Sequence, residues 1–212
     1  MIEEDPDMAA PKRPNSDQII DAAMACAART RWREVTLADI AAEAKVSLAQ
    51  LHEVYRSKSA IVAALGDRVD RAVLAGTDAD AGAEPVHDRL LDVLMRRLDA
   101  LAPHKDAVAS ILRDAPCDPV AAVRASPRLI RAMSWHLESA GVGSTGLAGR
   151  IRAKGLAAIY LSALWVWLRD DSPDHGRTLA HLDTSLRRAE RLAVALSLAP
   201  RAPREPAAEA AP

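Results

Sequence analysis

Cysteine is scarce in this 212-residue chain, which has only Cys26 and Cys117. Two cysteines cannot form a disulfide framework, and nothing in their spacing indicates a metal site. The chain therefore suits a reducing compartment, and we expect a cytoplasmic protein. Cys26 falls in an apolar helical pattern, where a thiol is expected to serve as a small core side chain.

A hydrophobic run long enough to cross a membrane is also missing. The longest largely apolar stretch, residues 156–168, is shorter than the roughly 20 residues that a membrane-spanning helix needs. It therefore predicts a buried helix. The first residues are acidic (Glu3, Glu4, Asp5 and Asp7) and contain no apolar segment, so a signal peptide is not expected.

An overall excess of positive charge is missing as well, since the formal net charge is −1. Between Lys12 and Lys58, however, eight Lys and Arg residues stand against six Asp and Glu residues. This local excess is a weak electrostatic footprint for a nucleic-acid-binding surface. An ordinary mixed surface would explain it equally well.

Recognisable catalytic patterns are lacking. The six histidines are scattered, and none pairs with a serine or cysteine and a carboxylate in a nucleophile elbow. The sequence has no glycine-rich phosphate loop and no His-x-x-x-His spacing. We therefore expect neither an enzyme nor a bound cofactor or metal.

What the sequence does contain is a pattern of two short helices from Thr36 to Lys58. Thr36 can cap the first helix, with Asp39 completing a capping box, and Lys45-Val46 form the turn. Ser47 is a natural N-cap for the second helix. One apolar stripe is predicted on each helix, formed by Leu37, Ile40, Ala41 and Ala44 on the first and by Leu51, Val54 and Tyr55 on the second. Two short helices joined by such a turn can place the second helix in a DNA major groove.

This stretch resembles the DNA-binding domain of TetR-type bacterial regulators. The matching elements are Thr36, Asp39-Ile40-Ala41, Ala44, Val46-Ser47, Leu51, Tyr55 and Ser57-Lys58, and the similarity extends from Ile19 to Val62. The resemblance implies an all-α, TetR-like fold, with an amino-terminal three-helix helix-turn-helix domain and a carboxyl-terminal helical bundle for ligand binding and dimerisation. The chain departs from the family pattern at Ala27, Arg31, Lys45, His52 and Val54. A glycine is usual at position 45, where a side chain costs roughly 1 kcal/mol if the backbone is left-handed.

The resemblance also implies a partner, double-stranded DNA with a palindromic operator, bound by a homodimer. The candidate DNA-binding residues are Thr36, Lys45, Ser47, Gln50, His52, Tyr55 and Lys58. We expect Gln50 to point outward and bind adenine through its amide. Lys45, His52 and Lys58 suit phosphates, which position a protein without reading sequence. The alternative is that this set is an ordinary solvated helix surface.

The remaining pattern is helical throughout and indicates two domains. Residues 1–15 are expected to be a flexible arm, 16–60 the helix-turn-helix domain, 61–198 the ligand-binding and dimerisation domain, and 199–212 a disordered tail. Ser16 and Ser57 are expected to cap the first and fourth helices. Later helices are predicted to begin at Pro85, at Ser126-Pro127, near Leu147 and near Arg177.

A second resemblance lies in the carboxyl-terminal half. Residues 97–108 and 156–189 are similar to a ubiquinone-biosynthesis accessory family, chiefly through Ala-Ala-Ile-Tyr (157–160) and Asp-Ser-Pro-Asp (171–174). Those proteins share the TetR fold but bind lipids instead of regulating transcription. The alternative function is therefore a lipid-binding protein that assists ubiquinone biosynthesis without binding DNA.

Aromatic residues make up only 3% of the chain, and several of them gather in this second half. Trp135, Tyr160, Leu164 and Trp165 are the candidate ligand-binding residues for an apolar small molecule or lipid. The alternative is that they belong to the core or to a dimer interface. Trp165 and Trp167 lie about 200° apart on a helix, so we expect one to face inward and the other a partner subunit.

Overall fold

The computed structural model describes residues 15–76, 84–115 and 119–195, and every regular element in these ranges is a helix. The arm before Asn15, the tail, the loop at 77–83, Cys117 and the last turn of the expected final helix lie outside the described residues. The expected all-α fold is confirmed in these ranges. Within the described ranges, none of the helices has the combination of length and apolarity that a bilayer span requires.

The chain divides into two compact units, each made of two segments. The amino-terminal unit comprises residues up to Ala72 together with Ala100–Arg128, and the carboxyl-terminal unit comprises Val73–Asp99 together with the chain from Leu129 onward. The boundary predicted after residue 60 does not coincide with this division. Sequence periodicity could not reveal that a segment some 40 residues further along returns to the first unit.

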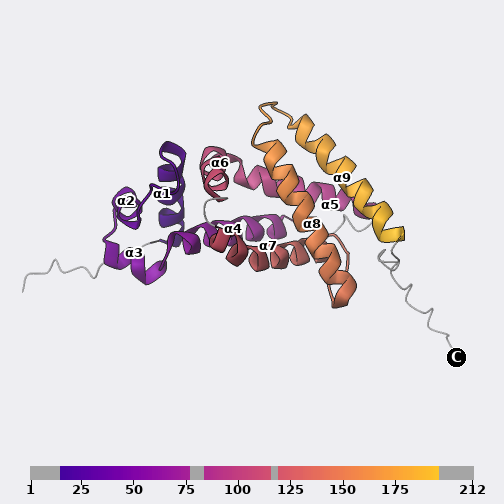
Figure 1. The fold of residues 1–212 in the computed structure, drawn as a ribbon, viewed down its shortest axis with the longest axis horizontal. Helices are drawn as coiled ribbons and strands as arrows, with labels where there is room; N and C mark the ends of the chain where they lie inside the picture. Colours follow the sequence, from indigo (N-terminus) through magenta and orange to yellow (C-terminus); the bar gives the residue numbers. More distant parts are fainter. Residues whose placement is uncertain (1–14, 77–83, 116–118, 196–212) are drawn as a thin grey trace, which may run out of the picture. The chain divides into compact units, whose positions relative to one another are not determined.

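The amino-terminal unit contains α1 (Ser16–Arg29), α2 (Leu37–Glu43), α3 (Leu48–Val54), most of α4 (Lys58–Ala75), the 3₁₀ turn η2 (Ala102–His104) and α6 (Lys105–Asp114). Helix α1 packs against α2 and α6 (Figure 1). Ile40, Ala41, Ala44 and Leu51 of the predicted apolar stripes are buried in its core, whereas Leu37, Val54 and Tyr55 are half-buried. The rest of this core includes Ile19, Ile20, Ala23, Met24 and Ile61.

Four helix caps were predicted in this unit, at Ser16, Thr36, Ser47 and Ser57, and the first of them is wrong. Ser57 Oγ accepts from the Ala60 amide at 3.1 Å, which confirms it as the cap of α4. Helix α1 is capped by Asn15, not by Ser16, because the Asn15 side chain accepts from the Asp17 amide at 3.1 Å. Asparagine and serine cap equally well, so the pattern alone did not separate the two neighbours.

An arginine of α4 ties α4, α1 and η2 together. Arg68 lies 2.8 Å from the Asp21 carboxylate and 2.9 Å from Nε2 of His104. An arginine can only donate, so Nε2 accepts and the imidazole is neutral here. Burial, and next the Arg68 charge, lower the pKa of His104. This polar cluster therefore supports the packing of α1 on the η2–α6 segment.

The carboxyl-terminal unit is built from most of α5 (Val86–Leu101), the part of α7 (Pro119–Ser139) from Leu129 onward, α8 (Gly146–Trp167) and α9 (Gly176–Ala195). Helices α8 and α9 lie side by side, drawn in orange and yellow in Figure 1. Leu94, Leu98, Met133, Trp167 and Leu182 form its centre and are essentially inaccessible. Glycine is required at position 149, where a Cβ atom would lie 2.0 Å from the Ser144 carbonyl.

The predicted start of α7 at Ser126-Pro127 is wrong, since the helix begins at Pro119 and continues through Pro127. A proline is well suited to the first helical position. Within a helix it removes one backbone hydrogen bond, which α7 tolerates. The prediction assumed that a helix starts at an internal proline, and it therefore placed the start of α7 seven residues too late.

Candidate nucleic-acid interface

The first helix of the motif begins with the capping box that the sequence predicts. Thr36 Oγ1 accepts from the Asp39 amide at 3.1 Å, and the Asp39 carboxylate accepts from the Thr36 amide at 2.8 Å. Backbone and side-chain hydrogen bonds from Thr36 hold the pKa of Asp39 below its ordinary value. Two otherwise unpartnered amides at the helix start are satisfied in this way.

The turn between α2 and α3 has the hydrogen-bond pattern of a Schellman motif. The Lys45 amide donates to the Ala42 carbonyl at 3.1 Å, and the Val46 amide donates to the Ala41 carbonyl at 3.0 Å. Lys45 itself is left-handed, with φ of 55°. Gln18 Nε2 of α1 donates to the Ala44 carbonyl at 2.7 Å and holds the turn against α1. The turn therefore keeps its geometry although glycine is absent.

Lys45→Gly is expected to raise the melting temperature by roughly 2–4 °C, because it removes about 1 kcal/mol of left-handed strain. Lys45→Ala is the matched control, since it deletes the charge but keeps the Cβ atom. Thermal unfolding followed by circular dichroism measures both variants. An equal melting temperature for the glycine and alanine variants would show that the turn stores no strain.

Helix α3 buries one side and exposes the other. Leu51 is fully buried in the core, whereas Ser47, Leu48, Ala49 and His52 are exposed. Ser47 caps the helix as predicted, accepting from the Gln50 amide at 3.1 Å, and the Gln50 side chain closes the box by accepting from the Ser47 amide at 2.8 Å. The Gln50 side-chain oxygen is therefore engaged in the cap, and the binding of adenine by Gln50 stays a prediction. Its NH₂ group remains the available donor.

Lys58 does not point outward, contrary to the prediction. Its ammonium donates to the Trp32 and Val35 carbonyls and lies 4.5 Å from the centroid of the Trp32 ring. Burial lowers the pKa of Lys58, against the opposing charges of Asp114 and Asp39. The sequence showed a cation at the start of a helix but not the backbone carbonyls that it would meet. In this conformation Lys58 supports the α1–α2 loop.

The last predicted DNA-binding residues are Thr36, Tyr55 and Lys45. Thr36 and Lys45 are exposed, at the start of α2 and in the turn. Tyr55 follows α3, half-buried, and its hydroxyl lies 2.5 Å from Ser16 Oγ at the start of α1. The structure thus gathers Lys45, Ser47, Gln50 and His52 around the turn and the first part of α3. Tyr55 and Lys58 make contacts within the unit.

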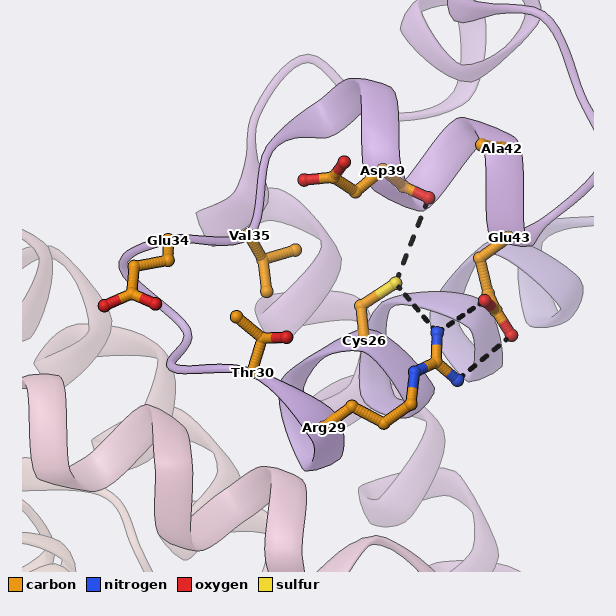
Figure 2. Close-up of a pocket in the computed structure, with 8 residues that line it drawn as sticks. All are labelled: Cys26, Arg29, Thr30, Glu34, Val35, Asp39, Ala42 and Glu43. Carbon is orange, nitrogen blue, oxygen red and sulfur yellow. Dashed lines mark hydrogen bonds and ion pairs between the residues drawn. The ribbon is translucent and has the colours of Figure 1, made fainter.

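A hollow of about 460 Å³ opens between α1 and α2, and Figure 2 shows its lining residues. Cys26 Sγ lies 3.9 Å from the Asp39 carbonyl oxygen and 3.8 Å from the Arg29 guanidinium, which is paired with Glu43 at 2.5 Å. Burial raises the pKa of the Cys26 thiol, so the nucleophilic thiolate is disfavoured. Asp39 is engaged in the capping box. The polar groups of this hollow therefore serve the packing of α1 on α2.

The four predicted ligand-binding residues separate into two pairs. Tyr160 and Leu164 are buried in the carboxyl-terminal unit, at 4% and 5% exposure, whereas Trp135 and Trp165 are exposed by 60% and 41%. Trp135 and Trp165 therefore do not line an interior pocket with Tyr160. Trp167 is the inward tryptophan of its pair, and Trp165 faces away from the core.

A buried polar group that the sequence does not single out lies beside Tyr160. Arg97 is a charged residue, for which exposure is expected, yet it is 6% exposed. Its Nη1 atom lies 3.1 Å from Nε2 of His136, and its guanidinium lies 4.9 Å from the Tyr160 ring centroid. Burial and the Arg97 charge lower the pKa of His136 to about 4. The available signal was the spacing of Arg97 seven residues after Leu90, which puts both on one helical stripe.

Among the described residues, no group of three His, Cys, Asp or Glu side chains is placed to hold a metal ion. The amino-terminal helices match a known family. Residues 19–65 match the model of bacterial regulatory proteins of the tetR family, and residues 151–193, within α8 and α9, match the COQ9 family model. No curated protein matches the chain.

Solved structures show the same fold over most of the chain. The TetR transcriptional regulator from Nitrosomonas europaea ATCC 19718 is 29% identical, with a TM-score of 0.68, over 82% of this chain and 96% of that one. A TetR transcriptional regulator from Rhodococcus sp. RHA1 is 18% identical (TM-score 0.60; 81% and 93% covered). A tetR-family regulator from Streptomyces coelicolor is 17% identical (TM-score 0.57; 85% and 82% covered). These likenesses confirm the TetR-like fold that the sequence predicts. The chain is similar to the tetR family over its helix-turn-helix segment and to COQ9 over a carboxyl-terminal segment.

Proposed function

We propose that the protein is a non-enzymatic transcriptional regulator that binds a palindromic operator as a homodimer and responds to an apolar small ligand. The observation that carries the proposal is the intact helix-turn-helix motif formed by α2 and α3. Helix α3 is capped and fixed at its turn, while its first residues Ser47, Leu48 and Ala49 stay exposed. A helix presented in this way can enter a major groove with its amino-terminal residues at the base edges.

The exposed groups around α3 suit distinct parts of a DNA duplex. Lys45 and His52 can contact phosphates, which fixes the register of the protein. The Gln50 NH₂ group can donate one hydrogen bond to a base acceptor, and the Ala49 methyl group can contact a thymine methyl. Because the Gln50 oxygen accepts from the Ser47 amide, bidentate recognition of adenine would first require that capping bond to break.

Gln50→Glu tests this role, because glutamate preserves the capping acceptor but has no NH₂ donor and adds a negative charge. We expect the melting temperature to stay within about 2 °C and operator affinity to fall roughly tenfold or more. Lys45→Ala should instead lower the salt slope of binding by about one unit per monomer. Genomic DNA captured by the protein and sequenced supplies the duplex, and fluorescence anisotropy at several salt concentrations measures the affinities.

Wild-type protein that captures no genomic fragment in a salt-dependent way would exclude the regulator function. Gln50→Ala is the companion variant, since it removes both the cap and the donor. If Gln50→Glu bound the operator as tightly as wild type, α3 would not read DNA through this residue.

A second candidate function has its own observation, the match of residues 151–193 to COQ9. We infer that a TetR-fold lipid-binding protein assisting ubiquinone biosynthesis is the alternative. Helix α8 is largely apolar, with Tyr160 and Leu164 in the core and Leu161 and Trp165 exposed. Organic extraction of the purified protein followed by mass spectrometry identifies any bound lipid. In a regulator, lipid and operator affinities must change reciprocally, whereas a lipid carrier has no DNA affinity to couple.

A further inference from the structure

Two buried side chains of α6 hold the loop between α1 and α2. Ser110 Oγ accepts from the Trp32 amide at 3.0 Å and donates to the Thr30 carbonyl at 3.3 Å. Asp114 Oδ2 accepts from the Arg33 amide at 2.8 Å. Both side chains belong to residues that are only 8% exposed. Two amides of this loop, those of Trp32 and Arg33, are therefore satisfied by a helix that lies far along the chain.

The same loop is held by a side chain of α4. The Lys58 ammonium donates to the Trp32 and Val35 carbonyls. Val35 itself is buried and is followed at once by Thr36, the N-cap of α2. Helix α6 thus binds the Trp32 and Arg33 amides and the Thr30 carbonyl, and α4 binds the Trp32 and Val35 carbonyls. The last residue of the loop adjoins the cap at which α2 begins.

We propose that Ser110 and Asp114 are positioning residues for DNA reading, and that α6 sets the orientation of α2 and α3 by fixing the α1–α2 loop. We name the contacts of Ser110 and Asp114 with residues 30–33 the α6 latch. The inference rests on the proposed function and assigns to it two positioning residues that lie outside the helix-turn-helix motif.

The physical reason lies in the cost of an amide that loses its acceptor in a partly buried place. Hydrogen bonds to a charged carboxylate, such as that of Asp114, are stronger than those between neutral groups. The bonds to the Trp32 and Arg33 amides are partly buried, so an amide that loses its acceptor there must find water instead. A loop without the Ser110 or Asp114 acceptor should therefore open to water more often.

Hydrogen exchange of the full-length protein tests the latch directly. Ser110→Ala and Asp114→Ala should speed exchange of the Trp32 and Arg33 amides about five- to tenfold. Asp114→Asn keeps an acceptor oxygen and should restore most of the protection of Arg33. Arg113→Ala is the matched control, because its exposed side chain lies on the same turn of α6.

Operator affinity, measured with a duplex from the genomic capture, separates positioning from simple stabilisation. Asp114→Ala should bind this duplex about five- to tenfold more weakly, Asp114→Asn should recover affinity, and Arg113→Ala should match wild type. Unchanged exchange in Ser110→Ala and Asp114→Ala would overturn the latch. Faster exchange with unchanged affinity would overturn its role in DNA reading. Wild-type protein that binds no fragment would refute the proposed function and the DNA role together, while the exchange data would still decide whether α6 holds the loop.

Discussion

Asp170→Ala is expected to lower the melting temperature by roughly 5–10 °C, one of the largest effects of any single substitution in the chain. Asp170 is 1% exposed, and its Oδ2 atom accepts from the Thr178 amide at 2.9 Å and from the Thr178 hydroxyl at 2.7 Å. Its Oδ1 atom accepts from the amide and hydroxyl of Ser172. Alanine would leave buried donors without an acceptor at the start of α9.

The pH dependence of this effect follows from the direction of the pKa shift. Hydrogen bonds from Ser172 and Thr178 lower the pKa of Asp170, so its stabilisation is present above the unfolded pKa of about 3.9 and declines as the pH falls below it. The difference between wild type and Asp170→Ala should therefore be constant above about pH 5 and shrink in more acidic solution.

Thermal unfolding between pH 3 and 8 measures both the size and the pH profile of the effect. Asp99→Ala is the matched control, since Asp99 is an exposed carboxylate of the same unit. A melting temperature for Asp170→Ala within about 1 °C of the control would show that the Asp170 hydrogen bonds do not stabilise the α8–α9 pair.

The double substitution Leu161→Glu and Trp165→Glu is expected to convert a homodimer into a monomer. Both side chains are 41% exposed on α8, and their burial between two subunits would release apolar surface from water at about 25 cal/mol per Å². Each subunit would then bring two carboxylates into the interface, opposite two more from the partner subunit. The free-energy cost of burying these charges exceeds the free energy gained by association. Light scattering should report a mass of 22.7 kDa per particle in place of twice that value.

Operator affinity should fall together with dimerisation. The two half-sites of a palindrome lie about 34 Å apart, and each binds one α3 helix of the dimer. Loss of the link between the two subunits is expected to lower operator affinity roughly a hundredfold or more. Trp135→Glu is the control, because Trp135 is 60% exposed on α7 and lies outside the proposed surface. A monomeric wild-type protein at micromolar concentration, or a double variant that remains dimeric, would refute this interface.

Local features of the chain were predictable from the sequence because their causes are local. The caps at Thr36, Ser47 and Ser57 follow from residue types at fixed spacing within one helical turn. The left-handed backbone at Lys45 follows from its position just after the end of α2, where helices often end with a left-handed residue. The angle between Trp165 and Trp167 predicts that only one can be buried, but not which one, because the helix pattern is apolar on both faces.

Contacts between distant segments could not be predicted in the same way. The Lys58 ammonium meets carbonyls more than 20 residues away, and Ser110 and Asp114 meet amides about 80 residues away. These partners depend on how α4 and α6 pack on α1, which no single-helix pattern contains. The buried Arg97 was missed for a related reason, since charge in a sequence argues for exposure, whereas His136 and Tyr160 come from other helices.

The Asp-Ser-Pro-Asp element at 171–174 carried part of the similarity to lipid-binding proteins. In the structure it forms the turn between α8 and α9, next to the Asp170–Thr178 hydrogen bonds. The element therefore has an architectural reason to recur wherever two helices are joined in this way. Its presence supports the helical hairpin more directly than it supports a lipid ligand.

The two-segment make-up of the amino-terminal unit also orders events on the ribosome. Residues up to Ala72 emerge first, but the acceptors for the Trp32 and Arg33 amides, Ser110 and Asp114, come about 40 residues later. At 5–20 residues per second, the nascent reading motif waits roughly 2–8 s for them. During that interval the Trp32 and Arg33 amides lack these acceptors. The α1–α2 loop is therefore completed only after Val73–Asp99, the first segment of the second unit, has been made.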